Sequence, residues 1–64
     1  MQPKSKLYRM AVRLQKKCEK QGYQYTELQL NMFEALGRAE WDESKVSWLV
    51  LEQFEWLYAR FYPN

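Results

Sequence analysis

The sequence predicts an all-α fold, a compact three-helix domain with helices at about residues 4–21, 26–38 and 43–61. Three stretches repeat apolar residues three and four positions apart, which is the spacing of one face of an α-helix. Residues that end or begin helices separate these stretches, namely Gly22, Thr26 and Asp42. Sixty-four residues are enough for one domain, so we expect residues 1–64 to form a single helical domain.

The first predicted helix begins after Gln2 or Ser5, because either side chain can cap the free N–H groups of a first turn. Gly22 adopts a left-handed backbone without steric cost and therefore predicts the end of this helix. The expected core face consists of Leu7, Met10, Ala11, Leu14 and Cys18.

The start of the second predicted helix is the best specified boundary in the chain. Thr26 and Gln29 have the spacing of a capping box, and Tyr25 and Leu30 occupy the two positions of a hydrophobic staple. Gly37 either ends this helix or only weakens it. Its expected core face consists of Leu28, Met32, Ala35, Leu36 and Ala39.

The third predicted helix starts with Asp42 as its N-cap, with Glu43 in the first turn and Trp41 and Val46 as the staple. Pro63 prevents any continuation of the helix. An ordinary core stripe is formed by Val46, Val50, Phe54, Leu57 and Phe61.

Further aromatic and aliphatic residues surround that stripe, and three helices cannot enclose all of them. Exposed clusters of Trp, Tyr and Leu are typical of protein interfaces. The alternative is that wide aromatic side chains fill a small core and leave only their edges wet. The residues expected to form the interface are Trp48, Leu49, Trp56, Tyr58 and Tyr62.

Charge is distributed unevenly along the chain. Residues 1–22 hold seven basic residues and one acid, a net charge of +6, whereas residues 23–64 carry a net charge of −4. The basic residues of the first helix share one side, as a surface that binds phosphate groups would require. The alternative is a solvated side, or one neutralised by acids of the other helices. The residues expected to bind an anion or nucleic acid are Arg9, Arg13, Lys16, Lys17 and Lys20.

We find no residue pattern that predicts catalysis, and we expect the protein not to be an enzyme. The chain has no His, and its one Cys, Cys18, lies on the expected core face without a base to activate it. Glu40, Asp42 and Glu43 are better explained as helix-capping groups than as a metal site. We therefore expect no metal, no cofactor and no small-molecule substrate, since so short a chain hardly encloses a pocket.

A single free thiol and the lack of an export signal favour a cytoplasmic location, and the longest apolar run is too short to span a membrane. We therefore expect no membrane partner. The sequence favours a small non-enzymatic binding protein whose partner is another protein or a second copy in a homodimer. The alternative is a protein that binds the phosphate backbone of nucleic acid through its first helix.

Overall fold

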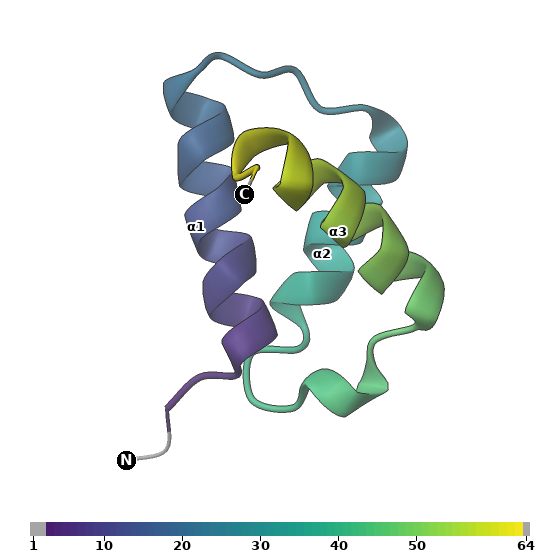
Figure 1. Cartoon of the computed structure of the whole chain (residues 1–64). Helices are drawn as coiled ribbons and strands as arrows, with labels where there is room; N and C mark the ends of the chain where they lie inside the picture. Colours follow the sequence, from purple (N-terminus) through teal and green to yellow (C-terminus); the bar gives the residue numbers. More distant parts are fainter. Residues whose placement is uncertain (1–2, 64) are drawn as a thin grey trace.

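The computed structural model describes residues 3–63 and confirms the all-α three-helix prediction (Figure 1). Its elements are helix α1 (Lys6–Lys20), helix α2 (Glu27–Gly37), the 3₁₀ turn η1 (Glu43–Lys45) and helix α3 (Trp48–Phe61). The three helices pack against one another, and η1 contacts α1. In Figure 1 the last turn of α3 lies beside the middle of α1, where the Tyr62 hydroxyl reaches the carbonyl of Arg13.

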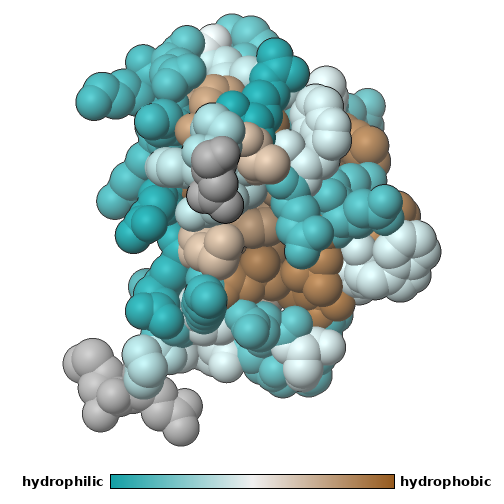
Figure 2. All heavy atoms as spheres, in the orientation of Figure 1, coloured by the Kyte–Doolittle hydropathy of each residue, from teal (hydrophilic) through white to brown (hydrophobic). Residues whose placement is uncertain are grey.

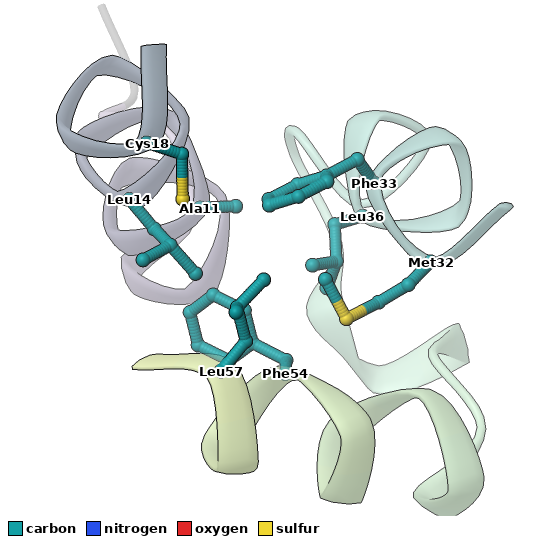
Figure 3. Packing of buried hydrophobic residues seen from close by; sticks show 8 residues of the cluster. All are labelled: Ala11, Leu14, Cys18, Met32, Phe33, Leu36, Phe54 and Leu57. Atoms are coloured by element: carbon teal, nitrogen blue, oxygen red, sulfur yellow. The ribbon is translucent and has the colours of Figure 1, made fainter. Parts of the chain in front are cut away.

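The core lies where the three helices meet, and each helix contributes side chains to it (Figure 3). Leu14, Leu36 and Leu57 are completely buried, one from each helix. Among residues 3–63, no polar or charged residue is buried. The full set of packed core residues is Ala11, Leu14, Cys18, Met32, Phe33, Leu36, Phe54 and Leu57.

Ser5 caps helix α1 and also ties its start to the end of α2. Its Oγ accepts the N–H of Tyr8 at 3.2 Å and donates to the carbonyl of Ala39 at 2.7 Å. Its own N–H donates to the carbonyl of Glu40 at 2.8 Å. Ser5 therefore pairs a free N–H in the first turn of α1 and two carbonyls of the connection that follows α2, which would otherwise need water. At the other end of α1, Gly22 has φ +70°, the left-handed conformation that its position predicts.

The predicted capping box of α2 is confirmed, since the Thr26 Oγ1 accepts the N–H of Gln29 at 3.1 Å and the Gln29 Oε1 accepts the N–H of Thr26 at 3.0 Å. Gly37 belongs to the helix and has no positive φ, so it does not end α2 in a left-handed cap.

The predicted core face of α2 was partly wrong. Leu28 is 59% exposed, whereas Phe33, which is not part of the predicted core face, is buried. The buried face centres on Leu36, which lies about 80° round the helix from Leu28 at 100° per residue.

The connection before α2 contributes an unbroken chain of aromatic contacts. Tyr23 meets Phe61 edge to face at a ring distance of 5.3 Å and meets Tyr25 at 5.7 Å. Tyr25 in turn meets Phe33 at 5.1 Å. These rings join the end of α3 to the middle of α2, and contacts of this geometry stabilise beyond the area they bury.

The predicted start of the third helix at residue 43 is wrong. Asp42 caps only η1, accepting the N–H of Ser44 at 3.0 Å, and the chain is extended at Val46. Helix α3 begins after Ser47, whose Oγ accepts the N–H of Val50 at 3.3 Å. Trp41 is 61% exposed, and because no α-helix starts at Asp42, Trp41 and Val46 do not occupy the staple positions of a helix.

Glu43, predicted in the first turn of the third helix, contacts α1 instead. Its Oε2 accepts the N–H of Leu7 at 2.8 Å, in the first turn of α1. A carboxylate at this position pairs a free N–H and meets the positive end of the helix dipole. Glu43 therefore lies in η1 and stabilises the first turn of α1, not the first turn of α3.

Replacing Ser5 by Ala is expected to reduce the free energy of unfolding by about 2 kcal/mol, because it removes a cap and a tertiary hydrogen bond. Ser47→Ala is the matched control, since Ser47 caps α3 without a tertiary bond, and is expected to cost about 1 kcal/mol. Urea unfolding followed by circular dichroism measures both. Equal losses would show that the bond to Ala39 adds nothing.

Candidate interaction surfaces

Three of the five residues expected at an interface lie on the outer side of α3. Trp48 is 73% exposed, Trp56 is 61% exposed and Leu49 is 53% exposed. Large apolar side chains exposed to this degree, and gathered on one helix, are unusual for an isolated domain.

Tyr58 and Tyr62 are placed differently from the expectation that groups them with these three residues. Both are half-buried and pack against the core. Their rings stack on each other at 4.8 Å, and Tyr58 lies 5.4 Å from the ring of Phe54. The reason is their spacing, since Phe54, Tyr58 and Tyr62 follow one another at intervals of four residues along the inner edge of α3.

An apolar groove lies between the first turns of α2 and the outer side of α3, and we call it the α2–α3 groove. Its apolar walls are Leu28, Leu49 and Trp56. Its polar positions are Thr26, Gln29, Glu52 and Gln53. Leu28, predicted for the core, is the apolar residue that α2 contributes to this groove.

Arg60 holds Trp56 from one side. Its guanidinium carbon lies 5.8 Å from the ring centres of both Trp56 and Tyr23. Cation–π contacts at such distances favour one ring orientation. Arg60 therefore links the exposed Trp56 ring to the half-buried Tyr23.

The basic residues of α1 gather on one side of the helix, as their spacing predicts, and we call this set the basic face (Arg9, Arg13, Lys16, Lys17 and Lys20). Together with Val12 and Tyr62 they line a shallow depression. The Lys17 Nζ lies 5.1 Å from the centre of the Tyr62 ring, and the Tyr62 hydroxyl reaches the carbonyl of Arg13 at 3.5 Å. Figure 2 shows hydrophilic side chains along the α1 side of the molecule.

The acids of the other elements do not neutralise the basic face by direct contact. Within residues 3–63 the ion pairs are Lys4 with Glu40 at 3.3 Å and Arg38 with Glu34 at 2.6 Å. Neither includes a residue of the basic face. Five cations therefore share one helix side without a paired carboxylate, an arrangement that costs a few tenths of a kcal/mol for each neighbouring pair.

Cys18 is completely buried and lies beside the Tyr25 side chain. Burial raises the pKa of the Cys18 thiol above its ordinary value, so the thiol stays protonated and shielded from solvent. Burial, and then the adjacent Cys18, raises the pKa of Tyr25 to about 12. The Tyr25 oxygen is buried without a geometrically good hydrogen bond within residues 3–63.

The three neighbouring acids before α3 have separate structural roles. Glu40 pairs with Lys4, and Glu43 caps α1. Hydrogen bonds from the Ser44 hydroxyl and N–H hold the pKa of Asp42 below its ordinary value. Across the described part of the chain, no cluster of three His, Cys, Asp or Glu side chains is placed to hold a metal ion. Every helix within residues 3–63 falls short of the length and apolar character needed to cross a membrane.

Sequence reasoning missed two members of these surfaces. Leu28 fits the apolar period of α2 and so was expected in the core, but it lines the groove. Tyr62 was assigned to the aromatic surface, but it completes the basic depression. Its position eight residues after the buried Phe54 is the signal that places it on the inner edge of α3.

Comparisons of the chain with models of protein families, with curated proteins and with solved structures find no match. Function is therefore inferred from the surfaces themselves.

Replacing Tyr25 by Phe is expected to make stability less dependent on pH in alkaline solution. The unfolded chain ionises Tyr25 near pH 10, whereas the folded chain keeps it neutral up to about pH 12. The stability that the neutral Tyr25 hydroxyl contributes to the folded chain is complete below pH 10, and it is lost as the pH rises from about 10 to about 12. Urea unfolding at pH 8, 10 and 11 measures the free energy of unfolding. As the pH rises, this free energy should fall less in the variant than in the wild type. Parallel curves for the two proteins would contradict the assignment.

Proposed function

We propose that the protein is a small non-enzymatic binding protein that associates through the α2–α3 groove, and that the occupant is a second copy of the chain. The observation that supports this most is the grouping of Leu28, Leu49 and Trp56 as exposed apolar walls of one groove. Trp and other large apolar anchors are the residues that dominate binding energy in interfaces.

The large solvent-accessible area of the chain is consistent with association through part of that surface. The solvent-accessible area is 5098 Å². A monomer of 7.9 kDa typically exposes roughly 4,400 Å². The chain therefore exposes more surface than its mass predicts. A domain this small also gains more from association than a larger one, because it buries a smaller part of its surface on folding.

The order of residues along α3 suits a symmetric pair. A two-fold axis between Glu52 and Gln53 would set Leu49 of one copy opposite Trp56 of the other. The same axis would set Glu52 opposite Gln53, so that a carboxylate faces an amide and not another carboxylate. Such an arrangement uses one surface twice, as symmetric dimers do.

Trp56→Ala is expected to weaken self-association at least fivefold, equivalent to more than about 1 kcal/mol, while helix content stays unchanged. Sedimentation equilibrium over a range of concentrations measures the dissociation constant. Association through apolar groups should persist at high salt.

Trp41→Ala is the matched control, because Trp41 is also 61% exposed but lies on the connection after α2, outside the groove. It is expected to leave the dissociation constant unchanged. A wild-type chain that stays monomeric at every concentration would overturn the proposal, as would equal weakening by both Trp substitutions.

A further inference from the structure

We propose that the basic face of α1 is a second, separate binding site, and that its ligand is the phosphate backbone of duplex nucleic acid. The site does not depend on the α2–α3 groove, because the two surfaces share no residue.

The geometry of the row suits a regular series of phosphates. Arg9 and Lys20 lie eleven residues apart, which is about 16 Å along an α-helix. A duplex carries one phosphate charge for every 1.7 Å of its axis when both strands are counted, so a 16 Å length presents roughly nine phosphate charges to the five cations. None of the five is engaged by a carboxylate within residues 3–63, and all except the half-buried Lys17 are exposed. They can therefore contact phosphate without first breaking an ion pair.

The state of Tyr62 favours a duplex over a single strand. Single strands are held by bases that stack on open aromatic rings. The Tyr62 ring instead stacks on Tyr58 and makes a cation–π contact with the Lys17 ammonium, so it already packs against other side chains of the protein. The depression therefore offers contacts to the backbone and no free stacking surface. Backbone contacts carry no sequence information, so binding is expected to be independent of sequence.

The net charge of the rest of the chain helps to turn the basic face toward a nucleic acid. Residues 23–64 carry a net charge of −4, in contrast to the +6 of residues 1–22. A molecule polarised in this way turns its basic side toward a polyanion during approach, and the effect weakens with salt.

Fluorescence anisotropy of the full chain with a labelled 20-base-pair duplex tests the proposal. Five phosphate contacts predict a slope of about −4.5 for log K against log salt, a loss of roughly 500-fold between 50 and 200 mM. Two duplexes of unrelated sequence should bind within about threefold of each other, and the matching single strand should bind more weakly.

Arg13→Glu combined with Lys16→Glu is expected to abolish duplex binding and to leave self-association unchanged, since both side chains are exposed and lie outside the groove. Arg38→Glu combined with Lys45→Glu changes the net charge equally, but these residues lie just after α2 and in η1, and this variant should still bind. Four outcomes would overturn the proposal: no duplex binding at 50 mM salt, tighter binding of the single strand, equal binding of polyglutamate, or equal loss in both double variants.

Discussion

The fold depends on pairing the free backbone groups at the ends of its helices. The first turn of α1 has N–H groups without helical partners, and the chain after α2 has carbonyls without them. Ser5 pairs groups of both kinds, and Glu43 pairs the N–H of Leu7. These few bonds fix α1 against α2 and η1. Packing of α1 against α3 then brings the basic face of α1 beside Tyr62.

The small size of the core explains why the chain has both an exposed apolar groove and an exposed basic face. Eight side chains fill the space where three short helices meet, and the remaining aromatic residues must lie outside it. Some of these pack along the edges, as Tyr23, Tyr25 and Tyr58 do. Others, above all Trp48 and Trp56, remain exposed. The small core also determines where the charges of α1 lie. The inner side of α1 is buried in the core, so the cations of α1 share its outer side.

Local signals predict this fold well, and long-range contacts account for what they miss. Capping boxes and left-handed glycines act within four residues, so Thr26 and Gly22 could be assigned from the sequence. Glu43 has the sequence of a first-turn acid, but its partner Leu7 lies 36 residues away. The positions of Leu28 and Tyr62 likewise depend on which neighbouring helix each one meets. The basic row was predictable because it lies on one helix, whereas a groove built from two helices was not.

The position of Cys18 has a consequence for how the motion of this protein can be followed. The thiol is 0% exposed and is surrounded by side chains from the other helices. A thiol-reactive dye can reach it only when the helices separate, and burial keeps it unreactive until then. The rate of labelling therefore acts as a clock for the opening of the native state, in the same sense as the exchange of its most protected amide hydrogens.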